Sequence, residues 1–188
     1  MKKQVMRIAL GIIVSSAVFT SCKKDKVEEP NEEEVITTMQ LAFVPVGGGA
    51  TVTYKFDDPD GPGGGVPTQD EIVLAPSKTY NVTMQLLNKT ETPVADVTTE
   101  IQAEADAHRF YYEPTAGSNI TVSGLDNDGD GMPLGINSTW LTGAVTTGKI
   151  KITLRHYPGT PPGKAIGDLV NSSKSGTDIE VEFNTKIQ

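Results

Sequence analysis

Hydrophobic and polar positions alternate with a period of two along most of the chain from residue 35 onward. The clearest case is segment 51–56, where Val52, Tyr54 and Phe56 are separated by threonine and lysine. Strict alternation is typical of a β-strand with one buried face. The same period recurs in short segments at residues 35–43, 72–74, 80–86, 109–112, 120–122, 139–142, 149–155 and 179–187. The pattern therefore predicts many short strands, the first two of which form a hairpin.

Segment 93–107 has helical periodicity instead. Its hydrophobic residues fall on one helical stripe, at Val94, Val97, Ile101 and Ala105. Thr92 is suited to cap a helix, and proline, here Pro93, is favoured at the first helical position. We therefore expect one helix of about four turns over 93–107.

Turn residues separate the predicted strands. The chain has 19 glycines and 12 prolines, and several of them cluster in loops such as 57–69 and 157–176. Many short strands joined by glycine-rich turns favour an all-β architecture. We predict a mainly all-β domain over residues 35–188, an immunoglobulin-like antiparallel β-sandwich with the single helix at 93–107.

The first 22 residues have a different character. Basic residues precede an apolar run at 8–19 (IALGIIVSSAVF), and small residues then lead to Cys22, the single cysteine of the chain. This order is typical of a signal peptide, and the run is shorter than the ~20 residues that span a bilayer. We predict a lipoprotein signal peptide at residues 1–21 and lipidation of Cys22, which would anchor the protein to a membrane. The alternative is an ordinary secretory signal with an incidental cysteine.

Residues 22–34 consist mainly of charged side chains and show no apolar periodicity, so we expect a solvated tether. Removal of residues 1–21, which carry three basic and no acidic residues, changes the formal charge from −8 to −11. So acidic a protein repels nucleic acids and attracts cations. We therefore expect no nucleic-acid partner.

An acidic loop at 125–137 (LDNDGDGMPLGIN) carries the most regular chemical motif of the predicted domain. Asp126, Asp128 and Asp130 occupy alternate positions before a glycine, and Asn137 stands twelfth in the series. Carboxylates at this spacing can converge on one calcium ion, although Asn137 replaces the usual glutamate. The alternative is a polar turn, because Asp, Asn and Gly are also the usual turn residues.

Both histidines of the chain lie at ends of predicted strands. His108 shares the parity of the hydrophobic positions that follow it, and His156 shares that of the positions that precede it. Glu104 lies four residues before His108, one helical turn away if the helix continues. Glu104, His108 and His156 are therefore candidate ligands of a transition metal. The alternative is a pair of hydrogen-bonded structural histidines.

The motifs of common enzymes are missing from the sequence. We find no nucleophile elbow, no H-E-x-x-H zinc motif and no phosphate-binding loop. We therefore expect a protein that is not an enzyme.

Four stretches carry a family resemblance: NEEEVITTMQLAFVPVGGGATVTYKFDDPDG, NKTETPVADVTTEIQAEADAHRFYY, LDNDGDGMPLG and LRHYP. They resemble a group of small Bacteroidetes lipoproteins, often labelled "type 1 periplasmic binding fold superfamily protein". That label implies a larger, two-lobed α/β fold, whereas the alternating pattern here predicts a sandwich. The resemblance implies a lipoprotein and brings no catalytic residues with it.

These observations favour a lipid-anchored binding or accessory module at the outer membrane, facing the periplasm or the cell surface. The negative charge and the acidic loop indicate capture of a cation or another nutrient, with an outer-membrane transporter as the expected partner. The alternative is a structural or adhesive surface lipoprotein whose loops are ordered by calcium.

Overall fold

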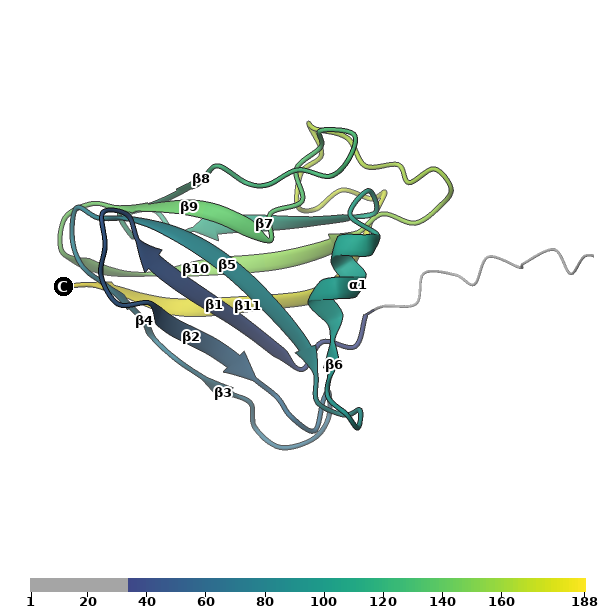
Figure 1. Ribbon diagram of the computed structural model, residues 1–188, viewed down its shortest axis with the longest axis horizontal. Coiled ribbons are helices and arrows are strands. Elements are labelled where there is room, and N and C mark those ends of the chain that lie inside the picture. The colour runs from purple at the N-terminus through teal and green to yellow at the C-terminus, as the bar shows by residue number, and fades with distance from the viewer. Residues whose placement is uncertain (1–33) are drawn as a thin grey trace, which may run out of the picture.

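Two β-sheets pack face to face in the computed structural model, which describes residues 34–188 (Figure 1). The predicted signal peptide, Cys22 and almost all of the predicted tether lie outside the described residues. The strands of the larger sheet are β1 (Thr38–Pro45), β2 (Val52–Asp57), β3 (Thr68–Gln69), β5 (Thr79–Asn88), β6 (Ala95–Asp96), β8 (Ile120–Ser123) and β9 (Asn137–Thr142). They follow the order β3–β2–β1–β5–β9–β8, and β6 pairs with one end of β5.

The smaller sheet carries the two strands on which His108 and His156 lie. Its members are β4 (Ile72–Leu74), β7 (His108–Pro114), β10 (Thr146–His156) and β11 (Gly176–Ile187), in the order β4–β11–β10–β7. The paired strands are antiparallel, as predicted, except for β4 and β11, which run parallel to each other. Strand β4 follows β3 of the larger sheet and joins the smaller one by a crossover rather than through a hairpin.

The inner faces of the two sheets form one hydrophobic core. Alternate residues of β1 and of β10 are completely buried in it, as the period of two predicted, and include Met39, Leu41, Phe43, Ile150, Ile152 and Leu154. Full burial of each such side chain contributes roughly 1.5–3 kcal/mol. The predicted β1–β2 hairpin pairs antiparallel in register. The mainly all-β sandwich is therefore confirmed.

The helix is shorter than the hydrophobic stripe predicted. It is α1 (Val97–Ala103), and its N-cap is Asp96, whose carboxylate accepts a hydrogen bond from the backbone N–H of Thr98 at 3.0 Å. The expected start at Pro93 is wrong because β6 (Ala95–Asp96) pairs with β5 and keeps that part of the chain extended. The buried residues Val97 and Ile101 hold the remaining two turns against the sheet.

One end of the sandwich brings several chain segments together (Figure 1). The end of α1, the start of β7, the end of β10 and the start of β11 all lie there, and the described chain begins beside α1. The C-terminus lies at the opposite end. Within residues 34–188, no helix is both long and apolar enough to cross a membrane.

Asp57, at the end of β2, is joined by polar contacts to β1 and to the turn that follows β5. Its carboxylate accepts hydrogen bonds from Lys89 Nζ at 2.5 Å and from Thr38 Oγ1 at 2.7 Å, and Lys55 Nζ lies 3.3 Å away. Burial by itself raises the pKa of Asp57, but these donors outweigh it and lower the pKa to about 2. The charged form is thus favoured in the folded state.

We expect Asp57→Asn to change how stability depends on pH. The pKa of Asp57 is lower in the folded protein than in the unfolded chain, so its contribution is present above about pH 4 and is lost as the pH falls toward about 2. That contribution is roughly 2 kcal/mol. In urea unfolding, the variant should therefore be less stable than the wild type at neutral pH and equally stable at about pH 2. A difference that stays constant with pH would contradict this account.

Candidate metal centre

The two histidines of the chain face each other across neighbouring strands. His108 is the first residue of β7 and His156 the last of β10, and the antiparallel register places them directly opposite each other. Their ring centroids are 4.5 Å apart. The His108 ring is fully buried, whereas His156 is half-buried. Two residues that are 48 positions apart in the sequence thus form one imidazole pair. This agrees with the sequence pattern, which places both histidines on the core-facing side of their strands.

Glu104 completes the predicted set of ligands. It caps the C-terminal end of α1, so the helix ends before His108 and the two residues do not share a helix face. A turn nevertheless returns the chain, and one candidate ligand atom from each of Glu104, His108 and His156 lies within 4.8 Å of the others. Within residues 34–188, this is the only group of three or more His, Cys, Asp or Glu residues that satisfies that distance.

Hydrogen bonding fixes the protonation of the His108 ring. Its Nδ1 lies 3.0 Å from the backbone carbonyl oxygen of Glu104, which only accepts, so Nδ1 carries the proton and Nε2 the lone pair. Within the described residues, His108 Nε2 and His156 Nδ1 are both buried without a hydrogen-bond partner. Buried polar atoms normally have partners. An imidazole held through one nitrogen, with the other left open, is the arrangement of a metal-binding histidine.

The electrostatic environment keeps both imidazoles neutral. Burial lowers the pKa of His108 to about 4, and the positive charge of Lys164 acts in the same direction. Burial also lowers the pKa of His156, against the opposing charge of Glu104. Neutral imidazole is the form that coordinates a metal, so both rings are ready to bind at neutral pH without losing a proton.

Asp178 approaches the same centre, and the sequence did not reveal it. One carboxylate oxygen, Oδ2, lies 3.7 Å from His108 Nε2, and both side chains are fully buried. By alternation Asp178 shares the parity of Glu180 and Glu182, which face solvent. The β10–β11 register shifts here, because Leu154 pairs with Ile179 and Arg155 with Thr177. Asp178 is therefore the extra residue of a β-bulge, which turns its side chain inward.

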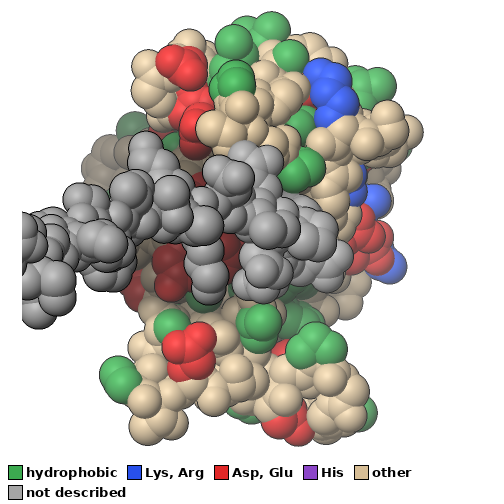
Figure 2. All heavy atoms as spheres, turned by 90° about the vertical axis from the view of Figure 1, so that its right-hand side faces the viewer, with side chains coloured by type: hydrophobic (Ala, Val, Ile, Leu, Met, Phe, Trp, Pro, Cys, Tyr) green, Lys and Arg blue, Asp and Glu red, His purple; other side chains and the backbone are tan. Residues whose placement is uncertain are grey.

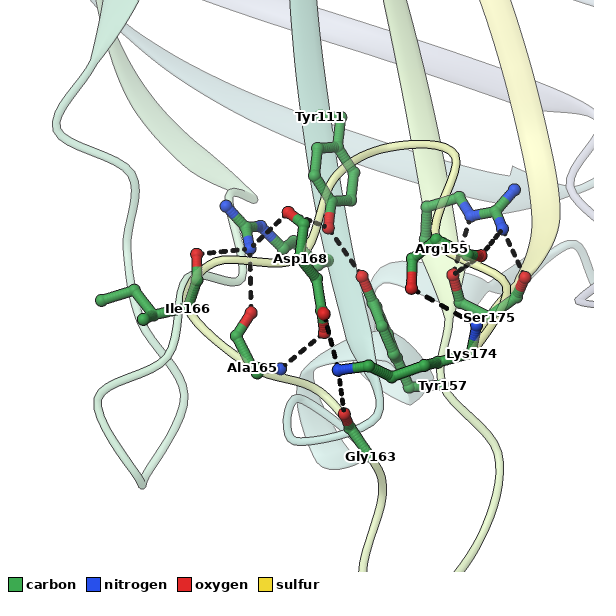
Figure 3. Close-up of polar contacts among 11 residues, drawn as sticks. Tyr111, Arg155, Tyr157, Gly163, Ala165, Ile166, Asp168, Lys174 and Ser175 are labelled. Atoms are coloured by element: carbon green, nitrogen blue, oxygen red, sulfur yellow. Dashed lines mark hydrogen bonds and ion pairs between the residues drawn. The ribbon is translucent and has the colours of Figure 1, made fainter.

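The long β10–β11 connection, residues 157–175, is tied to the strands on either side of it. Figure 3 shows the guanidinium of Arg155 bonded to the end of this loop, and its contacts include Ser175, Thr177 and the carbonyl of Ser172. Because Arg155 precedes His156 and Thr177 precedes Asp178, these bonds fix the two strand ends that carry site residues. Such support from neighbouring groups holds a site in its working geometry.

A second group of contacts holds the middle of the same loop (Figure 3). The Arg109 guanidinium donates to the carbonyls of Ala165, Ile166 and Asp168. The hydroxyl of Tyr111 lies 2.6 Å from that of Tyr157, the residue after His156. The loop therefore packs on β7 as well as on β10.

The predicted calcium loop is held by protein donors. Asp126 Oδ1 accepts the backbone N–H groups of Gly135 and Asn137, and the Asn137 side chain donates to Asp126 Oδ2, each at 2.9 Å. Asp128 Oδ1 accepts the N–H groups of Asp130 and Met132. The loop thus closes on itself through its own carboxylates, as a polar turn does.

The ammonium group of Lys164 lies where a cation would be expected beside this loop. Its Nζ is 2.6 Å from Asp128 Oδ2, and both side chains are almost completely buried. It also donates to the carbonyl oxygens of Ala105, His108 and Pro133, at 2.6, 2.9 and 3.4 Å. Among the described residues, Asp126, Asp128 and Asp130 do not form a close group of ligand atoms. Calcium binding by Asp126, Asp128, Asp130 and Asn137 stays a prediction, and a calcium ion at Asp128 Oδ2 would have to displace Lys164.

Other acidic side chains lie close to Glu104. Glu34 lies beside Glu100 and Glu104; burial, followed by their negative charges, raises the pKa of Glu34. Figure 2 views the molecule from this end and shows several acidic side chains on the part that is not covered in grey, with the basic ones toward one edge. Like charges gathered in this way attract cations toward the centre.

Comparison with family models, curated proteins and solved structures found no match for this chain. The assignment of a site therefore depends on the geometry described above.

We expect Lys164→Met to destabilise the protein strongly. Methionine keeps the apolar stem but leaves the buried Asp128 carboxylate without its counter-charge, a loss that typically costs about 3–5 kcal/mol. The matched control is Lys149→Met, which breaks the exposed pair with Glu182 and should cost less than about 1 kcal/mol. Urea unfolding measures both, and equal losses would contradict the role given to Lys164.

A melting experiment with added calcium separates the two interpretations of the acidic loop. If calcium binds as the spacing predicts, added calcium raises the melting temperature of the wild type, and Asp130→Asn removes this effect. If Lys164 is the cation of the loop, added calcium leaves the melting temperature unchanged.

Proposed function

We propose that this protein binds a divalent transition-metal ion through His108, His156 and Glu104. The observation that carries the proposal is the pair of facing imidazoles, whose buried atoms His108 Nε2 and His156 Nδ1 lack hydrogen-bond partners within residues 34–188. Imidazole and carboxylate ligands together suit zinc, copper or nickel, whereas calcium and magnesium prefer sites built from oxygen alone.

The position of the centre favours capture of an ion from solution. Glu104 is exposed while His108 is fully buried, so an ion would meet the carboxylate first and the imidazoles afterwards. The acidic side chains around Glu104 raise the local concentration of cations. A binding module, rather than a catalyst, is the function that these features support best.

We place this activity at the outer membrane, on the strength of the Cys22 motif and of the resemblance to Bacteroidetes lipoproteins. The described chain begins beside α1, at the end of the sandwich that carries the histidines. A tether that leaves from this end would keep the metal centre near the membrane surface. The partner expected at this position is an outer-membrane transporter, which would receive the captured ion.

Calorimetric titration of the full-length protein in detergent with zinc tests the proposal. We expect one ion per chain and a loss of affinity of more than roughly 100-fold in His108→Ala or His156→Ala. Loss of a direct ligand should exceed the ~10–100-fold cost of losing an outer-sphere partner. The chain has two histidines in total, so no other imidazole can substitute.

The control variant is Glu71→Gln, which removes one exposed carboxylate beside β4, at the opposite end of the smaller sheet. It changes the net charge as a Glu104→Gln variant does but should leave zinc affinity unchanged. No heat with zinc, copper or nickel, or equal losses in the histidine and control variants, would reject the metal centre. Calcium-dependent stability without transition-metal binding would favour the structural surface protein instead.

The anchor has a separate test. We expect wild-type cells to incorporate labelled fatty acid into this protein and to retain it in the membrane fraction, because two or three acyl chains anchor stably. Cys22→Ala should abolish the label and release the chain. Mass spectrometry should find the mature protein beginning at a lipid-modified Cys22. An unmodified cysteine would support the ordinary secretory signal.

A further inference from the structure

We infer that the metal centre keeps its fourth coordination position open to solvent, and that the ion leaves by direct transfer to an acceptor that supplies an imidazole at this position. The inference rests on the proposed function, and it adds the route of release and the chemistry of the acceptor. The argument comes from the number of protein ligands, from the way their exposure changes across the centre, and from the charge of the surrounding side chains.

The described chain brings three ligand residues together. Glu104, His108 and His156 form the only such close group within residues 34–188. Asp178 lies outside this group and has an interaction of its own within the protein. Structural zinc sites are closed by four protein ligands, whereas sites with three protein ligands hold water or an external molecule in the fourth position. The set of three therefore leaves one position for an exchangeable ligand.

The open position faces solvent. Exposure increases across the centre, from the fully buried His108 through the half-buried His156 to the exposed Glu104. His108 is fixed on the inner side, because its Nδ1 donates to the backbone carbonyl of Glu104 at 3.0 Å. An ion bound by the three residues thus has protein on the side of His108 and water on the side of Glu104. An external ligand can reach the ion without any opening of the sandwich.

Acidic side chains beside the centre select the acceptor. Glu34, Glu91 and Glu100 line a hollow of about 230 Å³, and the negative charges of Glu100 and Glu104 act on Glu34. A surface of this charge repels carboxylate and thiolate donors and attracts basic segments. Imidazole is neutral and binds zinc, copper and nickel. The acceptor that fits best is therefore a histidine on a basic segment.

Transfer at such a position is an exchange of coordination bonds. A nitrogen of the acceptor's imidazole displaces the bound water and bonds to the ion, and the bond to the exposed Glu104 carboxylate then breaks. The imidazoles on both sides are neutral, so the step moves no proton and no electron. The ion stays bound throughout, whereas a site closed by four protein ligands would first release it into solution.

X-ray absorption of the zinc-loaded, full-length protein in detergent tests the open position. We expect four nitrogen or oxygen ligands, two of them imidazoles, and a third imidazole after free imidazole is added, because it replaces the bound water. A count that stays at two imidazoles would overturn the inference and leave the metal centre intact. Absence of zinc binding would overturn the proposed function together with it.

Stopped-flow transfer of zinc to a synthetic peptide tests the route of release. The peptide contains histidines among lysines and carries a fluorescent label that responds to zinc. We expect the rate of transfer to rise with the concentration of the peptide, because the peptide binds the ion before the protein releases it. A rate that does not depend on peptide concentration would show that the ion dissociates first, and it would overturn direct transfer.

An acidic peptide, with the same histidines but glutamates in place of the lysines, tests the chemistry of the acceptor. We expect it to receive zinc at least about tenfold more slowly at low salt, and the difference to shrink at high salt. Glu100→Gln should reduce this difference, whereas the control Glu71→Gln, which removes an equal charge beside β4, should preserve it. Equal rates for the two peptides with the wild type would overturn the assignment of a basic acceptor.

Discussion

The end of the sandwich that carries the histidines depends on one constraint, the pairing register of β7, β10 and β11. In β7 and β10 it sets His108 opposite His156, and in β10 and β11 it shifts by one residue to turn Asp178 inward. A shift of one residue in either pair would move these side chains to opposite faces. The hydrophobic core enforces the register, because Ile150, Ile152 and Leu154 are buried only when it is kept.

Two internal cations hold the loops at this end of the sandwich. Lys164 joins the acidic loop to the start of β7, and Arg155 joins the long β10–β11 connection to the start of β11. A buried ammonium is tolerated only when it is fully paired, and Lys164 has four oxygen neighbours. These bonds tie the loops to the strands that carry the histidines, and such preorganisation would favour the affinity of the proposed metal centre.

Hydrophobic alternation predicted the strands well, because it reports which face of a strand is buried, and that is a local property of the sequence. The helix at 93–107 was predicted less well. Val97 and Ile101 of the predicted hydrophobic stripe are buried against the sheet. The helix begins only after Ala95 and Asp96, because these two residues pair with β5. For the acidic loop, the spacing of Asp126, Asp128 and Asp130 could not distinguish a cation site from a turn, because both need the same residue types. The structure adds Lys164, which lies 36 positions beyond Asp128.

The sequence by itself determined the all-β class, the strand segments and the core-facing parity of both histidines, because each follows from the order of neighbouring residues. Tertiary structure decided that His108 and His156 meet, that Asp178 joins them and that Lys164 pairs with Asp128. These contacts depend on strand register and on a bulge, which arise when distant segments pack against one another. A periodic pattern records on which face a residue lies, but it carries no information about which residue lies opposite.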